Sequence, residues 1–133
     1  MKYHFLPPCF VVKNGIHGIG IFTTKNIKKG SVLFEMQGDI LNHPTRTSVQ
    51  IGKMIHIEDD IARRINHNCK PTAKVDRKTR SFISLQDIKK GEEITFNYND
   101  NEDVLACPFV CACCYKKIAG RKFLLKNPEF GVI

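Results

Sequence analysis

The sequence predicts a single small domain with a mainly β fold and short helical turns. Apolar residues fall in short runs rich in β-branched and aromatic side chains, and Gly, Pro and Asn interrupt these runs. No window of about twelve residues shows a convincing helical period, although Glu58–Ile65 has room for two turns. The chain of 133 residues, 42% of them hydrophobic, is long enough to bury one core.

Six segments are predicted as strands from their β-branched and aromatic content: Phe10–Val12, Ile19–Thr23, Val32–Met36, Ala73–Val75, Ser81–Ser84 and Ile94–Phe96. Two further segments, Asn26–Phe34 and Asp87–Phe96, echo each other through the shared letters Ile-Lys-Lys-Gly. In each, the leading Asn or Asp can cap a single helical turn, and the Gly can take a left-handed turn before a strand. The echo therefore predicts two similar β-corners within one fold, because a repeat array needs several copies.

Charge and cysteine content limit the classes of protein to which the chain can belong. The net charge of +8 indicates either a well solvated surface or attraction to nucleic acid or an acidic partner. No stretch approaches the ~18 apolar residues of a membrane span, and residues 1–8 lack the apolar core of a signal peptide. Four of the six cysteines crowd into Cys107–Cys114, which favours thiols or metal ligands over a disulfide framework. We therefore expect an intracellular protein with no membrane partner.

Three segments occur in a suggestive order: His17–Phe22 with the letters HGIGIF, Arg63–Pro71 with RRINHNCKP, and Gly91–Tyr98 with GEEITFNY. Together they resemble the signature set of SET-domain protein-lysine methyltransferases, over about Val11–Leu125. The resemblance implies a SET (β-clip-like) fold of small curved sheets, in which two of the segments interlace as a pseudoknot. The short Leu41–Ile57 connection resembles that of compact stand-alone members.

The resemblance also divides the chain and gives it an activity. It implies a SET domain over residues 1–106, followed over 107–133 by a post-SET-like cysteine cluster and a closing segment, in one structural unit. The implied reaction moves a methyl group from S-adenosyl-L-methionine to a lysine amine of a protein or peptide, with histone or chromatin-like proteins as candidate substrates. The family's cofactor-binding positions correspond here to Gly18, Ile19, Gly20, Asn66, His67 and Phe123.

Tyr98 matches the family's catalytic tyrosine, which orients the amine and the methyl group. The substrate channel that the resemblance implies contains Tyr98, Phe96 and Met36. Phe96 stands where a Tyr would hold an extra water and restrict the site, so its presence favours di- or trimethylation. Met36 replaces a family Tyr and removes one phenol from the channel. Asn97 replaces the more usual Asp, and we attribute that change to local hydrogen bonding.

The cysteines resemble a post-SET zinc site, in which four thiolates bind one tetrahedral ion. Cys69, Cys111 and Cys113 match the family's first three ligands, whereas no cysteine stands at the position of the last. Cys114 or Cys107 remains as the fourth ligand, and Cys114 completes the candidate set. Free, reduced thiols are the alternative to zinc.

Two other functions compete with methyl transfer. Met36 and the positive charge are compatible with a catalytically silent SET fold that binds a peptide or nucleic acid. A zinc-ribbon-like nucleic-acid binder fits the cysteines but leaves Asn66-His67 and Glu93–Tyr98 unexplained. The positive charge also gives no account of how a basic histone-like tail is captured, because like charges repel. We expect a cytoplasmic protein in a prokaryote, and a nuclear or chromatin-associated one in a eukaryote or virus.

Overall fold

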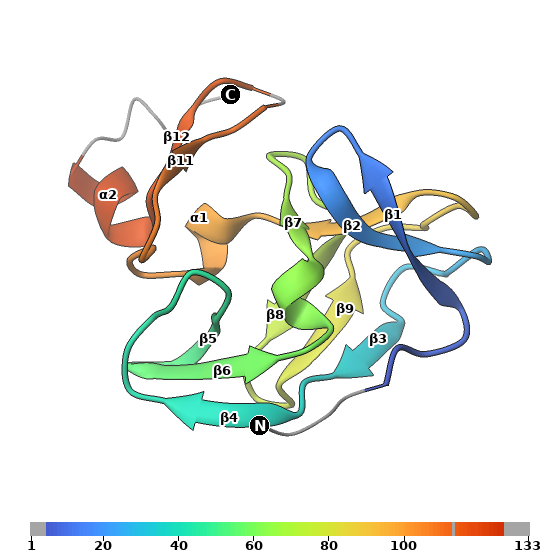
Figure 1. The fold of residues 1–133 in the computed structure, drawn as a ribbon, viewed down its shortest axis with the longest axis horizontal. Helices are drawn as coiled ribbons and strands as arrows, with labels where there is room; N and C mark the ends of the chain where they lie inside the picture. Colours follow the sequence, from blue (N-terminus) through green and yellow to red (C-terminus); the bar gives the residue numbers. More distant parts are fainter. Residues whose placement is uncertain (1–4, 113, 127–133) are drawn as a thin grey trace.

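A computed structural model describes residues 5–112 and 114–126 of the chain, and its fold is mainly β (Figure 1). The strands are β1 (Phe10–Gly15), β2 (Gly18–Thr23), β3 (Val32–Glu35), β4 (Gly38–Leu41), β5 (Val49–Gly52), β6 (Ile55–Asp59), β7 (Asn66–His67), β8 (Ala73–Asp76), β9 (Ser81–Ser84), β10 (Glu93–Phe96), β11 (Phe109–Val110) and β12 (Lys117–Ile118). Short helical elements accompany them: η1 (Ala62–Arg64), α1 (Tyr98–Asn101) and α2 (Arg121–Lys126). None of the described helices is long and apolar enough to cross a membrane.

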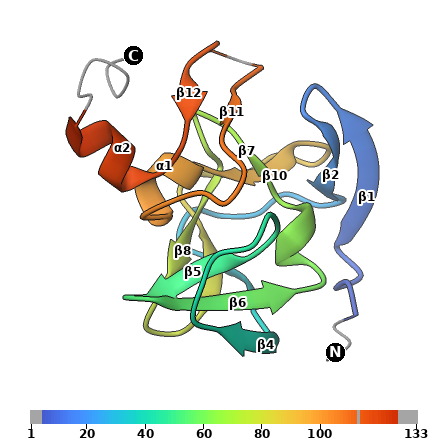
Figure 2. The same cartoon turned by 60° about the vertical axis from the view of Figure 1, so that its left-hand side comes forward.

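The described strands form four small sheets (Figure 2), and three of these share one core. Their strand orders are β1-β2-β10-β7, β3-β9-β8, β4-β6-β5 and β11-β12. The core takes side chains from each of the first three sheets, and the Phe82 ring at its centre lies 5.0 Å from the Phe34 ring and 5.1 Å from the Phe96 ring, between centroids. Because the core reaches Phe96 in β10, it supports the strand that leads into the site.

All six predicted strands are present, and the mainly β fold is confirmed. The helical prediction for Glu58–Ile65 is wrong, since β6 runs to Asp59 and only a single 3₁₀ turn, η1, follows. The buried Asp59 carboxylate explains this change of direction. Its Oδ1 accepts from Ile61 N and Ala62 N, both at 2.8 Å, and its Oδ2 accepts from Gln37 N at 2.7 Å. These bonds cap a short turn and end the strand.

The two echoing segments pack against each other as a pair of corners. Ile27 and Ile88 form an antiparallel bridge, and Gly30 and Gly91 both have a positive φ, as predicted for the glycines. Each capping side chain bonds to the opposite corner: Asn26 Oδ1 accepts from Lys90 N at 2.8 Å, and Asp87 Oδ1 accepts from Lys29 N at 2.9 Å. The prediction that each side chain caps its own turn is therefore wrong, because the bridge brings the two turns within reach of each other.

Two segments that are far apart in sequence meet where β7 and β10 pair in parallel. Thr95 lies opposite Asn66, and Phe96 lies opposite His67. Directly after β10, the Asn97 side chain accepts from Asn99 N at 3.0 Å and caps helix α1. This cap agrees with the local hydrogen bonding expected at position 97. The pairing places the start of α1 beside the Asn66 segment.

Backbone hydrogen bonds attach the C-terminal segment to α1. Arg121 N donates to Glu102 O at 2.7 Å, and Lys122 N donates to Asp103 O at 3.1 Å. The side chain of Asn99 accepts from Gly120 N at 2.8 Å. These bonds place α2 against α1, with the β11–β12 hairpin beside them (Figure 1).

Candidate active site

A cleft of about 1070 Å³ opens between the β1–β2 turn, η1, β7 and the segment that leads into β11. Four basic side chains line it: His17, Arg46, Arg63 and Arg64. Apolar side chains line it too, with Ile16, Ile19, Phe109 and Val110 among them. No Asp or Glu is among the described lining residues. The cleft can therefore hold a ligand that carries both an anionic group and an apolar or aromatic part.

Three of the predicted cofactor residues meet at one edge of this cleft. Asn66 Nδ2 donates to Ile19 O and to Glu93 Oε2, both at 2.9 Å. A Cβ on Gly20 would come within 2.2 Å of Glu93 Oε2 and 2.8 Å of Asn66 Nδ2, so these side chains can cross only a glycine. Gly18, with a φ of 87°, begins β2 directly after the turn formed by Ile16 and His17. The Asn66 amide thus fixes the β2 backbone that borders the cleft.

Tyr98 lies at the inner wall of the cleft and is tied to the residues around Asn66. Its hydroxyl donates to Ile65 O at 2.5 Å, and its backbone N–H donates to His67 Nδ1 at 3.0 Å. Burial raises the pKa of the phenol above its usual value, and the carboxylates of Glu102 and Glu93 raise it further. Tyr98 therefore stays a neutral phenol at physiological pH, able to form hydrogen bonds but not to accept a proton as a phenolate.

A second, smaller cavity of about 30 Å³ adjoins the cleft. Arg46, Thr47, Arg63, Tyr98 and Leu105 line both cavities, so the two meet at these side chains. Phe96, which is only 4% exposed, lines the smaller cavity, and its ring centroid lies 4.6 Å from that of Tyr98. The narrow cavity therefore ends at the phenol that also faces the broad cleft.

The side chains of Met36 and Phe123, both predicted for the site, line neither of these cavities. Met36 is 3% exposed and packs in the core. Phe123 lies on α2 with the Lys117 Nζ atom 5.1 Å from its ring centroid, and it also lines neither cavity. The backbone bonds of α2 explain this position, because they hold the helix against α1.

The aromatic cover that sequence reasoning missed is Phe109. Its ring lies 5.9 Å from that of His67 and 6.0 Å from that of Tyr98, between centroids, in both cases edge to face. The sequence contained one signal for this position, since Phe109 stands two residues before Cys111. Cys111 lies beside Cys69, and this contact brings the residues next to Cys111 to the cleft.

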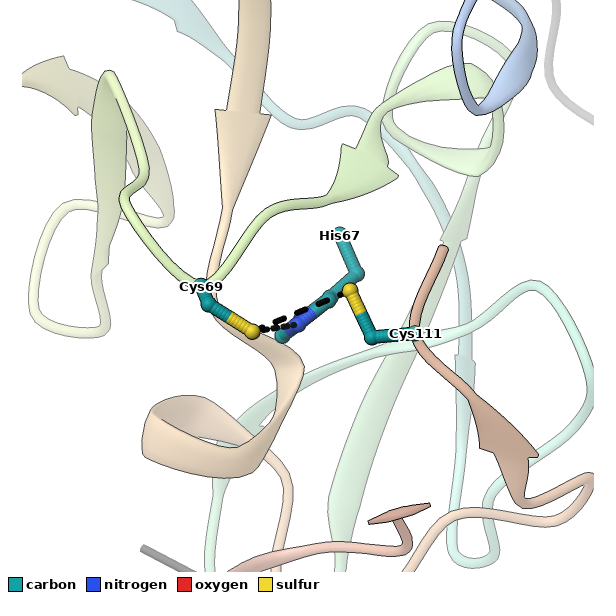
Figure 3. A group of neighbouring side chains, drawn as sticks. All are labelled: His67, Cys69 and Cys111. Carbon is teal, nitrogen blue, oxygen red and sulfur yellow. Dashed lines mark hydrogen bonds between the residues drawn. The ribbon is translucent and has the colours of Figure 1, made fainter. Parts of the chain in front are cut away.

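Cysteine sulfurs gather next to the cleft (Figure 3). Cys69 Sγ lies 3.7 Å from Cys111 Sγ, close to the spacing of about 3.8 Å between two thiolates on one tetrahedral zinc ion. The structure also bonds Cys69 to Cys114, where the sequence favoured thiols or metal ligands. Their Cα atoms are 7.0 Å apart, beyond the usual limit of about 6.8 Å for a disulfide. This separation also fits two thiolates that bind one metal ion. Cys113 lies outside the described residues.

His67 connects the cysteines to Tyr98, and it belongs with Cys69 and Cys111 to a described group of side chains that could hold a metal ion. Burial lowers the pKa of its ring to about 4, so the imidazole is neutral. Because Nδ1 accepts the Tyr98 N–H, the single ring proton must lie on Nε2, which faces Cys69 Sγ at 3.4 Å. In this tautomer His67 donates to the Cys69 sulfur, a contact that a dashed line marks in Figure 3, and the cysteine sulfurs remain as candidate metal donors.

The three signature segments and most of the strands overlap a region that matches a known family. The family model of the SET domain matches residues 18–99. The chain belongs to the SET domain family. This SET domain is 29% identical over 139 residues to a histone-lysine N-methyltransferase, H3 lysine-36 specific, of Debaryomyces hansenii, a match that covers 84% of the chain and 19% of the relative.

Other similarities agree with this family. The SET domain is 32% identical over 144 residues to a variant-silencing SET domain-containing protein of Plasmodium falciparum, covering 86% of the chain and 6% of the relative. The chain thus spans less than a fifth of the length of these curated relatives. Its fold is similar to that of a humanized mutant of the Chaetomium thermophilum Polycomb Repressive Complex 2 bound to the inhibitor GSK126, with a TM-score of 0.59 and 19% identity. That match covers 91% of the chain and 21% of the solved chain.

Proposed function

We propose that this SET domain is an S-adenosyl-L-methionine-dependent protein-lysine N-methyltransferase. The observation that carries the proposal is the position of Tyr98, where a narrow cavity meets a broad cleft. The narrow cavity fits the end of a lysine side chain, and the broad cleft fits the cofactor. Relatives named as histone-lysine N-methyltransferases support the reaction class.

The cleft has groups suited to each part of S-adenosyl-L-methionine, which supplies an electrophilic methyl group when bound. Arg63, Arg64 and His17 fit its carboxylate. The Asn66 amide holds the β2 backbone in place beside the amino-acid end, and Phe109 and Val110 fit the adenine. A solved structure of the same fold is described as ctPRC2 in an autoinhibited conformation bound to S-adenosylmethionine, with a TM-score of 0.60 and 17% identity. The donor set and the shape therefore fit this cofactor.

The residues around the narrow cavity have to orient a neutral amine. A free lysine has a pKa of about 10.4, so deprotonation near pH 7.4 costs roughly 4 kcal/mol. Tyr98 cannot remove the proton, since its pKa is raised, but its oxygen can orient the amine at the junction of the two cavities. The buried side chains of Phe96 and Ala62 give this cavity an apolar side.

We expect successive methylation beyond the first methyl group. Phe96 supplies no hydroxyl to hold a water beside the amine, and a methylated amine needs that volume to rotate. Phe96→Tyr should shift the products toward monomethyl-lysine, which mass spectrometry at long reaction times will measure. Phe5→Tyr, at an exposed ring, is the control and should leave the product distribution unchanged. A wild type that stops cleanly at monomethyl-lysine on its best substrate would contradict this role of Phe96.

Asn66→Ala should weaken S-adenosyl-L-methionine binding by about 1–3 kcal/mol, as measured by calorimetry. The substitution removes both hydrogen bonds of the amide, so it frees the Ile19 carbonyl and leaves the Glu93 carboxylate without this donor. The exposed Asn14→Ala on β1 is the matched control and should bind the cofactor normally. Unchanged affinity in Asn66→Ala would remove this residue from the cofactor site.

We also propose one zinc ion per chain, with Cys69, Cys111 and Cys114 among its ligands. The 3.7 Å spacing of two sulfurs and the Nε2–H of His67 beside Cys69 support a thiolate site. Elemental analysis should find about one zinc per chain, and Cys69→Ser should lower that content. A metal-free, fully active preparation with six titratable thiols would exclude a working zinc site.

The substrate that we propose is a lysine of a histone or chromatin-like protein, which places the enzyme at chromatin in a nucleus or in the prokaryotic cytoplasm. The test is transfer of radiolabelled methyl groups from S-adenosyl-L-methionine to histones, small archaeal or bacterial chromatin proteins and host-cell lysate. We expect label on lysine amines, identified by mass spectrometry. Cofactor binding without turnover on this panel would favour a silent, peptide-binding SET fold.

A further inference from the structure

A buried carboxylate that the proposed reaction does not use lines the narrow cavity. Glu102 follows helix α1, one turn after Tyr98, and only 2% of its surface is exposed. Its Oε2 accepts from Gln50 N at 2.8 Å and from Asn101 Nδ2 at 2.6 Å. Its Oε1 has no hydrogen-bond partner within residues 5–112 and 114–126. One oxygen therefore holds the carboxylate in place, while the other remains available to a ligand.

Glu102 is the only acidic residue among the described residues that line this cavity. The other ionisable lining groups are Arg46, Arg63 and the phenol of Tyr98. The arginines cannot accept a proton, and Tyr98 donates its own proton to Ile65 O. The carboxylate acts on the phenol as well, because it helps to raise the pKa of Tyr98. The cavity therefore contains one group that can serve as a proton acceptor.

The surroundings of Glu102 raise the pKa of its carboxyl group toward the value that suits a proton acceptor. Burial raises the pKa of its carboxyl group to about 7, against the opposing effects of the Gln50 and Asn101 hydrogen bonds and of the Arg77 charge. The nearby Asp103 carboxylate raises the pKa slightly further. A group with a pKa near the working pH is well suited to accept and then release a proton in each turnover.

We infer that Glu102 is the catalytic base that deprotonates the substrate lysine, an inference that rests on the proposed methyl transfer. One N–H bond of the ammonium breaks, its electron pair stays on nitrogen, and the proton bonds to a carboxylate oxygen of Glu102. The neutral amine then forms the C–N bond to the methyl group as the C–S bond breaks, and that electron pair stays on sulfur. The carboxylic acid returns its proton to solvent before the next round.

The first test compares pH–rate profiles. In the wild type, kcat/KM should fall below about pH 7 as Glu102 becomes protonated. Glu102→Gln keeps the shape of the side chain and an acceptor for Gln50 N, and it should lower kcat about 100-fold at pH 7. Activity of this variant should recover toward pH 10, where free lysine loses its proton unaided. Glu102→Asp should be intermediate, because it keeps the base on a shorter side chain.

The second test does not depend on turnover. NMR of protein labelled with ¹³C at glutamate carboxyl groups should show one signal that titrates near pH 7 and is lost in Glu102→Gln. Adding n-butylamine, which reproduces the lysine side chain, should lower that midpoint by about one unit or more, because an ammonium stabilises the carboxylate. Asp100→Asn, at an exposed site on the same helix, is the control and should leave both the midpoint and the amine response unchanged.

The two tests separate failure of the base from failure of the enzyme. A midpoint at the ordinary glutamate pKa of about 4.3, or one that n-butylamine does not move, would overturn the inference even if methyl transfer is found. Turnover in Glu102→Gln equal to that of the wild type at pH 7 would overturn it too. A carboxyl group that titrates near pH 7 and responds to n-butylamine, in a protein that never turns over, would support the cavity's amine site while refuting the proposed enzyme.

Discussion

Tyr98→Phe should lower kcat by about 10²- to 10³-fold while leaving S-adenosyl-L-methionine affinity within a few fold of wild type. The hydroxyl is held in a fixed orientation at the junction of the two cavities, because it donates to Ile65 O. The substitution therefore removes the hydrogen-bonding group that we propose orients the amine. Removal of one preorganised hydrogen-bonding group from an active site typically costs this much in rate. The rest of the cofactor cleft keeps its side chains, which is why binding should persist. Steady-state kinetics and calorimetry measure the two quantities separately.

A matched control exists in Tyr115, whose side chain is 81% exposed. Tyr115→Phe removes the same atom from the surface and should leave kcat unchanged. Near-normal turnover in Tyr98→Phe would remove Tyr98 from its assigned role. Loss of cofactor binding in Tyr98→Phe would instead show that the tyrosine shapes the cleft.

Glu102→Gln should stabilise the protein at alkaline pH, in contrast to its effect on turnover. The pKa of Glu102 is raised from 4.5 to about 7 by burial, so the folded state binds this proton more tightly than the unfolded state. The cost of burying the charge is absent below about pH 4.5, and it grows as pH rises to about 7. Ionisation of the buried carboxyl group lowers the free energy of unfolding by about 3 kcal/mol in full, because each unit of pKa change corresponds to about 1.4 kcal/mol.

Denaturant unfolding at pH 4, 6 and 8 measures this cost. The free energy of unfolding of Glu102→Gln, minus that of the wild type, should rise by about 3 kcal/mol between pH 4 and pH 8. Asp39→Asn, an exposed carboxylate on β4, should change the same difference by less than about 0.5 kcal/mol. A flat difference for Glu102→Gln would mean that the carboxyl group is not buried in the folded protein.

The strands were predictable because their signal is local. Val32–Glu35 and Ser81–Ser84 carry β-branched or aromatic side chains between turn residues, and both are strands in the structure. The β4-β6-β5 sheet was missed, because its strands mix glycine, acidic and amide residues with few aromatic ones. The helical segment before Asn66 was predicted too long, since the Asp59 carboxylate that ends β6 could as well have been a surface charge.

The sequence by itself determined the family, because the family signature depends on residue types in a fixed order, and it pointed to the reaction that we propose. Only the tertiary structure decided which side chains share a cavity. It placed Phe109 in the cleft and Met36 in the core, and it brought Glu102 to the same cavity as Tyr98. The physical reason is that these contacts depend on how separate sheets pack together. Pairings such as Thr95 with Asn66 join positions far apart in the chain. Local sequence patterns do not specify such contacts between distant segments.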